Sequence, residues 1–151
     1  MKKIVLFLVF LSWFHSSCNK CKGIICSSPP PSFAFKIVDK NNKNITGSFT
    51  DAVLKYSENG MAKETKLSKM TTTTQEPAFY AVEIGWISSA SSKDASFEVS
   101  VDSKIIGTLI CKVNPKNEDC CSFYEVDKLT FNGVSILEKR QSDNSFLLPV
   151  E

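Results

Sequence analysis

The chain has 151 residues, of which 18 are Lys or Arg, 16 are Asp or Glu and one is His, so its net charge is +2. This length is typical of a single domain. The charges are nearly balanced and the densest cluster, Glu138–Arg140, is mixed in sign. A surface of this kind gives little electrostatic attraction to phosphates, so we expect no nucleic-acid partner.

Residues 1–17 have the pattern of a secretory signal peptide. Lys2 and Lys3 form a positive start, the run Ile4–Phe14 is apolar apart from Ser12, and small residues follow. The run is shorter than the roughly 17–25 residues that a membrane-spanning helix needs. We therefore expect this segment to direct export and to be removed.

Cys18 comes directly after these small residues, and the segment resembles the lipobox of bacterial lipoproteins. In that family the signal is cut before the cysteine, whose thiol then carries a diacylglycerol. Ser17 fits the small residue before the cut, whereas His15 replaces the usual Leu or Val, as the looser lipoboxes of Bacteroidota permit. The resemblance implies lipid attachment at Cys18, which makes the lipid bilayer a partner, because two or more acyl chains anchor stably.

Residues 18–32 are expected to form a tether behind the lipidated cysteine. The sequence SSPPPS at Ser27–Ser32 favours extended polyproline geometry and disfavours a helix. Lipoproteins exported to the cell surface in this bacterial group often carry acidic residues after the cysteine, whereas Asn19–Gly23 is basic. This difference favours the periplasmic face of the outer membrane over the cell surface.

Removal of residues 1–17 would also remove His15, the only histidine. It would leave 16 basic residues beside 16 acidic ones. A mature chain without histidine excludes Ser-His-Asp and Cys-His catalysis, histidine acid–base chemistry and zinc sites with histidine ligands. We therefore expect no enzyme, no cofactor and no metal.

Residues 33–151 read as strands joined by turns. Side chains alternate between apolar and polar at Ala95–Asp102, which is typical of half-buried strands. The segment Ser32–Asp39 places Phe33, Phe35 and Ile37 on one face and Ala34, Lys36 and Val38 on the other. Strands apolar on both faces are expected at Ala78–Gly85 and Lys104–Val113, and further strands at Asp51–Gly60, Met61–Leu67, Cys121–Gly133 and Val134–Lys139.

The connections favour hairpins. Asn59-Gly60 and Asn132-Gly133 suit type I′ turns, and Asp102-Ser103 is a third short connection. Longer loops are expected at Ser68–Pro77 and Trp86–Ala95, and no segment predicts a helix. Seven or eight short strands predict an all-β fold, an antiparallel β-sandwich of immunoglobulin-like or transthyretin-like form, with a small β-barrel as the alternative.

The six cysteines suggest structural disulfides in an oxidising envelope. Residues 112–119 are expected to form a loop with a turn at Asn114-Pro115, which would let Cys111 meet Cys120 or Cys121. Cys21 or Cys26 would then pair with the other cysteine and fasten the tether to the sheet. Cys111, Cys120 and Cys121 lack the two-residue gap of a zinc knuckle or a thioredoxin-like pair, so metal and redox sites are disfavoured.

The segments DCCSFYEVDKLTFNGVSI at Asp119–Ile136 and PSFAFKIVDKNNKNITG at Pro31–Gly47 resemble small uncharacterised lipoproteins of Bacteroidota. The similarity covers most of the mature chain at the level of pattern. It implies a signal peptide, a lipidated cysteine and a β-rich domain, and it implies no reaction.

Two other groups of side chains could carry a function. The carboxylate pairs Glu118-Asp119 and Glu125/Asp127 could perform acid–base chemistry if they converged in a cleft, but solvated strand residues are the simpler interpretation. Four aromatic residues could form a sugar-stacking platform or belong to the core and its rim: Tyr56, Tyr80, Trp86 and Tyr124.

The sequence therefore favours a lipoprotein of the outer membrane that acts as a non-enzymatic binding or structural module and contacts another envelope protein or a glycan. One alternative is a small periplasmic inhibitor that presents the loop Lys69–Pro77 to the cleft of an envelope hydrolase. Another is a hydrolase that uses carboxylates alone.

Overall fold

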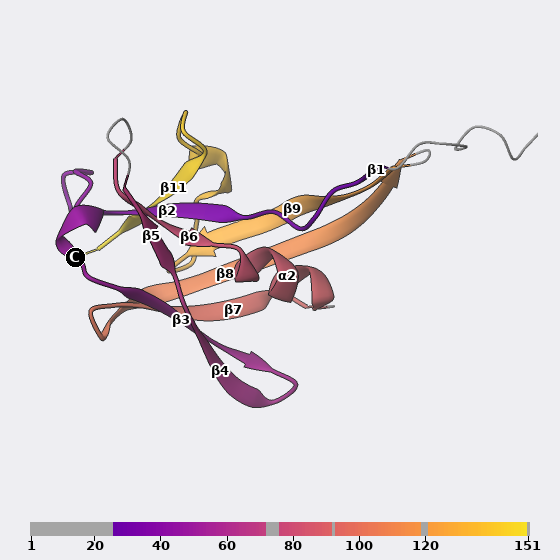
Figure 1. Ribbon diagram of the computed structural model, residues 1–151, viewed down its shortest axis with the longest axis horizontal. Helices are drawn as coiled ribbons and strands as arrows, with labels where there is room; N and C mark the ends of the chain where they lie inside the picture. The colour runs from indigo at the N-terminus through magenta and orange to yellow at the C-terminus, as the bar shows by residue number, and fades with distance from the viewer. Residues whose placement is uncertain (1–25, 72–75, 92, 119–120, 151) are drawn as a thin grey trace, which may run out of the picture.

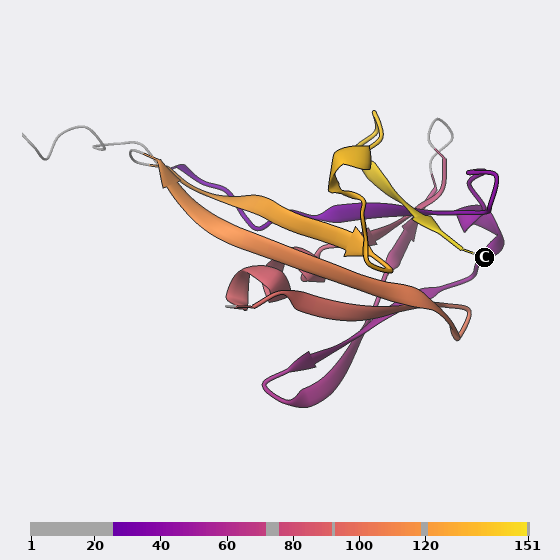
Figure 2. The same cartoon turned by 180° about the vertical axis from the view of Figure 1, so that it is seen from behind.

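The computed structural model describes residues 26–71, 76–91, 93–118 and 121–150. Over these residues the chain forms an all-β sandwich of two sheets with one α-helix (Figures 1 and 2). The predicted sandwich is confirmed. The described strands form two open sheets, so the alternative of a closed barrel is wrong.

The larger sheet contains seven strands of the described chain, and each pairs antiparallel with its neighbours except β1, which is parallel to β9. Their order is β1 (Cys26–Ser27), β9 (Cys121–Phe131), β8 (Lys104–Glu118), β7 (Ala95–Val101), β3 (Ala52–Glu58) and β4 (Met61–Lys66), with β10 (Val134–Ser135) also beside β9.

The smaller sheet contains four of the described strands, in the order β11 (Ser145–Pro149), β2 (Phe33–Val38), β6 (Ala78–Ala81) and β5 (Ser68–Met70). Strand β11 runs parallel to β2, whereas the other neighbours are antiparallel. Two single-turn 3₁₀ helices, η1 (Thr46–Ser48) and η2 (Leu137–Lys139), lie in connections, and the α-helix is α2 (Glu83–Ala90).

One hydrophobic core lies between the sheets. The alternation predicted for β7 is confirmed, since Phe97, Val99 and Val101 are all buried. The largest fully buried side chains come from both sheets: Phe33, Phe35, Ile37, Phe79 and Leu148 from the smaller sheet, and Leu54, Phe97, Leu109, Leu129 and Phe131 from the larger one. The pattern of alternation thus places these residues where burial of apolar surface stabilises the fold.

The three predicted short turns are confirmed by backbone geometry. Both central residues have positive φ in Asn59-Gly60 (53° and 79°), Asn132-Gly133 (49° and 81°) and Asp102-Ser103 (45° and 67°). Two consecutive residues with positive φ characterise the type I′ turn, whose twist matches that of the strands it joins.

The loop predicted at residues 112–119 is wrong, because strand continues through the described part of it. Strand β8 reaches Glu118, which pairs with Cys121, and Pro115 pairs with Tyr124. The pairing of β8 with β7 ends at Cys111 opposite Ala95, so in the described chain the later part of β8 has a partner on one side only. A proline, which lacks an N–H, is tolerated on such an edge.

The helix α2 was not predicted. The expected strand Ala78–Gly85 ends at Ala81, and the helix occupies part of the loop expected at Trp86–Ala95. Its buried residues are Ile84, Gly85 and Ser88, so its apolar stripe is too short to read from the sequence. None of the helices formed by the described residues has the length and apolar character that crossing a membrane would require.

Part of the expected tether belongs to the folded domain. Strand β1 pairs with β9, the N–H of Ser28 donates to the carbonyl of Ser122 (3.1 Å), and Pro30 is buried. A Cβ atom added at Gly85 would lie 2.0 Å from the carbonyl oxygen of Pro31. The boundary predicted at Phe33 is therefore too late. Strand β1 and the C-terminal end lie at opposite ends of the long axis (Figures 1 and 2).

Candidate functional site

A pocket of about 890 Å³ is lined in part by the turn between β7 and β8, and this turn lies at the end of the sandwich away from β1 (Figure 1). Its wall is mostly apolar and is formed where β2, β7, β9 and β11 end and β8 begins. Among the lining residues, Val38, Val101, Phe131 and Ile136 are buried, whereas Ile105 and Val134 are each 56 % exposed. Pockets of roughly 300–1,000 Å³ with mainly apolar walls are typical of small-molecule sites.

Two type I′ turns shape the mouth of the pocket. In the β7–β8 turn, Oδ1 of Asp102 accepts hydrogen bonds from the N–H groups of Thr50 (2.8 Å) and Asp51 (3.0 Å). In the β9–β10 turn, Oδ1 of Asn132 accepts a hydrogen bond from the N–H of Thr108 (2.8 Å). A Cβ atom added at Gly107 would lie 2.2 Å from that oxygen, so glycine gives Asn132 the room to approach β8.

The acidic side chain that lines the pocket has hydrogen-bond partners, whereas the basic side chains form no ion pairs. Lys40, Lys104 and Lys139 line it, are exposed, and form no ion pair with any side chain in the described ranges. Asp102 is the acidic residue of the lining, and its carboxylate already accepts two backbone hydrogen bonds. The mouth of the pocket is therefore positive.

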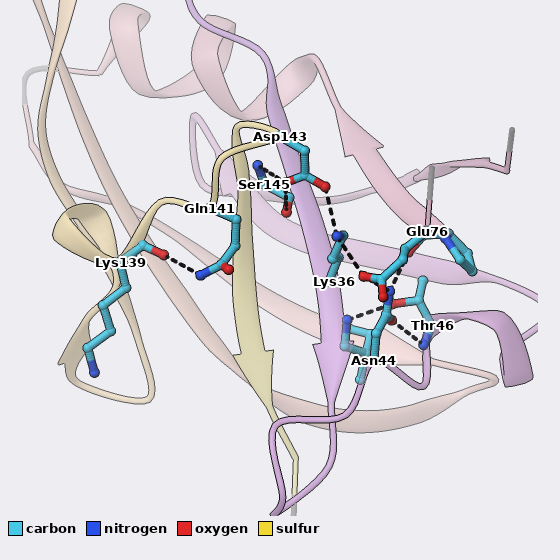
Figure 3. A network of polar contacts seen from close by, with 10 residues as sticks. Lys36, Asn44, Thr46, Glu76, Lys139, Gln141, Asp143 and Ser145 are labelled. Carbon is cyan, nitrogen blue, oxygen red and sulfur yellow. Dashed lines mark hydrogen bonds and ion pairs between the residues drawn. The ribbon is translucent and has the colours of Figure 1, made fainter. Parts of the chain in front are cut away.

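A second polar cluster surrounds Lys36 on β2 (Figure 3). Its Nζ contacts the carboxylates of Asp143 (2.7 Å) and Glu76 (2.8 Å), and only 10 % of the Lys36 side chain is exposed. Asn44 donates to Glu76 (3.3 Å), and the Ser145 hydroxyl donates to Asp143 (2.6 Å). The sequence placed Lys36 on the face of the strand opposite Phe33, Phe35 and Ile37, and the structure buries both faces of β2.

The Lys36 cluster has the features of a structural ion-pair network. Burial alone would lower the pKa of Lys36, but the hydrogen bonds that its ammonium group donates to Asp143 and Glu76 outweigh burial and raise the pKa. The hydrogen bond from Lys36 lowers the pKa of Glu76, and together with Ser145 it lowers the pKa of Asp143 to about 2. The hollow beside the cluster measures about 10 Å³, close to the volume of a single water probe, so it has no room for a ligand.

The ion pairs of the Lys36 cluster predict that the stability of the fold decreases at acidic pH. Because the folded state lowers the pKa of Asp143, its contribution is complete above the ordinary value of 3.8 and is lost as the pH falls toward about 2. We expect Asp143→Asn to lower the melting temperature at pH 6 and to lose most of this difference from the wild type by pH 2. Thermal melts between pH 2 and 6 test this, with Asp127→Asn as the surface control. A difference that persists unchanged at pH 2 would contradict the role of the Asp143 carboxylate.

The cysteine predictions have mixed outcomes. Cys111 is a free, buried thiol, so its expected bond to Cys120 or Cys121 is wrong. It pairs across the hairpin with Leu129, whereas Cys121 pairs with Glu118 at the far tip. Burial raises the pKa of Cys111 to about 11, so the thiol stays protonated at neutral pH. The buried Ser88 hydroxyl beside it has no partner with good hydrogen-bond geometry.

Cys121 is disulfide-bonded, and Cys111 is not its partner. Backbone pairing between β1 and β9 sets Cys26 opposite Cys121. Neighbouring strands lie about 4.8 Å apart, within the roughly 4.4–6.8 Å that a disulfide spans between Cα atoms. A bond from Cys26 to Cys121 stays a prediction, and Cys18, Cys21 and Cys120 lie outside the described residues.

The candidate carboxylates do not gather in a cleft. Glu118, Glu125 and Asp127 are exposed on the β8–β9 hairpin, and Asp119 lies outside the described residues. Glu125 forms an ion pair with Lys116 (3.1 Å), and Asp127 forms one with Lys112 (3.1 Å). Across the described residues no three potential metal-binding side chains come together. This arrangement gives the hydrolase hypothesis no support.

The four aromatic residues of the proposed sugar platform lie on different elements: Tyr56 on β3, Tyr80 on β6, Trp86 on α2 and Tyr124 on β9. Tyr56 packs at a centroid distance of 5.9 Å against Phe97, which is fully buried. Trp86 is 53 % exposed. The structure therefore describes no shared stacking surface for them.

Comparison with protein-family models, curated proteins and solved structures gave no match. The sequence did not predict the pocket, because the residues that line it come from turns and strand ends that are far apart in the chain. The Asn-Gly and Asp-Ser pairs were the one local indication of this region. They predicted where strands end, but they did not predict that these strand ends surround a pocket.

Proposed function

We propose that the protein is a non-enzymatic binding module of the cell envelope, anchored in the outer membrane through a lipid on Cys18. The apolar pocket with its positive mouth is the observation that carries the binding role. It offers a shaped apolar volume, whereas the carboxylates that a hydrolase would use are dispersed on an exposed hairpin.

The position of the pocket supports the same proposal. Strand β1 lies at the tip of the β8–β9 hairpin, and the pocket lies at the other end of the sandwich. A chain held to a bilayer ahead of Cys26 would therefore present the pocket away from the lipid surface. We favour the periplasmic face of the membrane, where a ligand, another envelope protein or a glycan could reach this end.

Metabolic labelling with an alkyne-bearing palmitate tests the anchor. We expect the wild-type protein to incorporate the label and to have an intact mass that begins at Cys18 and includes the acyl groups. Cys18→Ser should lose essentially all of the label, whereas the control Cys21→Ser should keep it. Equal labelling of Cys18→Ser, or a wild-type product that begins at Met1 without acyl mass, would refute the anchor.

A further inference from the structure

We propose that the end pocket binds an amphipathic acid, with an apolar chain or ring inside the pocket and a carboxylate or phosphate at the lysines of its mouth. This inference rests on the proposed binding function and adds the class of ligand. The shared chemistry is an apolar body that ends in one acidic group.

The apolar side chains in the wall of the pocket indicate that part of the ligand is apolar. Phe131 and Val101 are 2 % exposed and Ile136 is 4 % exposed, so the inner wall offers no charged group. Ile105 on β8 and Val134 on β10, each just after one of the two turns, are each 56 % exposed. Large apolar side chains exposed beside a hollow mark a place where burial by a ligand would be favourable.

The lysines that line the pocket indicate that the ligand carries an acidic group. Of the thirteen lysines in the described ranges, seven form ion pairs with Asp or Glu side chains and six do not. Three of those six, Lys40, Lys104 and Lys139, line this one pocket. The carboxylate of Asp102, which also lines the pocket, is held by the N–H groups of Thr50 and Asp51. An acidic group at the mouth would provide these ammonium groups with a counter-charge.

The three lysines also come from three separate connections. Lys40 follows β2, Lys104 begins β8, and Lys139 ends η2. Three separate segments of the chain thus each contribute a lysine to the lining of the pocket. A neutral molecule of the same shape would bury the same apolar area but would leave the lysines without a counter-charge.

Photo-crosslinking of the full-length anchored protein in phosphatidylcholine vesicles tests the proposal. The probe is a long-chain fatty acid that carries a diazirine in its chain and a terminal alkyne, and its methyl ester is the neutral comparison. We expect peptide mapping to place the crosslinks in residues 101–106 and 131–136. The acid should label these residues several-fold more strongly than the ester, and dodecanoate but not inorganic phosphate should compete.

Substitutions of lysine by glutamine test the role of the lysine charges in binding while the fold is kept. Lys104→Gln together with Lys139→Gln should weaken labelling by the acid about fivefold, on the scale of one exposed ion pair, and should leave labelling by the ester unchanged. Lys93→Gln, a surface lysine outside the pocket lining, is the matched control and should have no effect. If lysophosphatidic acid competes far better than dodecanoate, the acidic group is a phosphate of a lipid and not a carboxylate.

Three outcomes would overturn the proposal. Crosslinks confined to residues 18–31 would show that the probe reaches the protein only through the bilayer. Equal labelling by acid and ester would show that the lysines do not select the ligand. An absence of crosslinks in the pocket would refute the site itself. None of these results would affect the acylation of Cys18, so the failure of this inference is distinguishable from failure of the anchor.

Discussion

Replacement of Phe97 by alanine is expected to lower the free energy of unfolding by about 3–5 kcal/mol. Phe97 is completely buried on β7, where it pairs with Tyr56 of β3 and with Leu109 of β8. Removal of its ring would leave a cavity in the core between the two sheets. Urea unfolding followed by circular dichroism measures the change in free energy.

The matched control for this experiment is Met61→Ala. Met61 lies on the outer strand β4 and is 61 % exposed, so its truncation should change the unfolding free energy by no more than about 0.5 kcal/mol. Equal effects of the two substitutions would contradict the assignment of Phe97 to the core and of Met61 to the surface.

The second large effect is expected at Gly85 in α2. An alanine inside a helix normally stabilises it by about 1 kcal/mol relative to glycine. Here the added Cβ would lie 2.0 Å from the carbonyl oxygen of Pro31, so the helix and the segment before β2 must separate. We expect Gly85→Ala to destabilise the protein by about 1–3 kcal/mol, as overpacking does, and thermal melts measure it.

Gly47→Ala is the comparison for this prediction, because the nearest atom to its added Cβ is a side-chain carbon of Pro77 at 3.4 Å. It should change the melting temperature much less than Gly85→Ala. If Gly85→Ala were as stable as the wild type or more stable, Pro31 would not pack on α2, and the folded domain would begin after that segment.

Much of the fold could be predicted from the sequence, because local chemistry and tertiary packing agree there. The alternation in Ala95–Val101 matches a strand with one face in the core. The pairs Asn59-Gly60 and Asn132-Gly133 tolerate the positive φ that tight hairpins require. At these positions the local sequence alone is enough to predict the strand or the turn.

Other elements depend on neighbours that the sequence does not show. Pro115 predicted a turn, but it lies in a region of β8 that has a partner strand on one side only among the described residues, so its missing N–H is tolerated there. The alternation around Lys36 did not predict its partners, because Asp143 and Glu76 come from distant connections to pair with it. The eight residues of α2 are helical in a segment that contains Gly85 and two adjacent serines, which is a weak local signal.

The candidate site was the least predictable part. Lys40, Lys104 and Lys139 are ordinary surface lysines in the sequence, and only the meeting of three connections at one end of the sandwich gives them a common role. Cys111 shows the opposite case, because its sequence context predicted a disulfide and the extended hairpin carries the other cysteine away from it.

Hydrogen–deuterium exchange of the vesicle-anchored protein, with and without dodecanoate, tests the central claim that the pocket end binds an amphipathic acid while the other end is tethered. We predict slower exchange at the amides of Asp102–Ile106 and Asn132–Ile136, with no change at Met61–Lys66 or Glu83–Ala90. An unchanged exchange pattern, or protection that appears only outside the pocket, would contradict it.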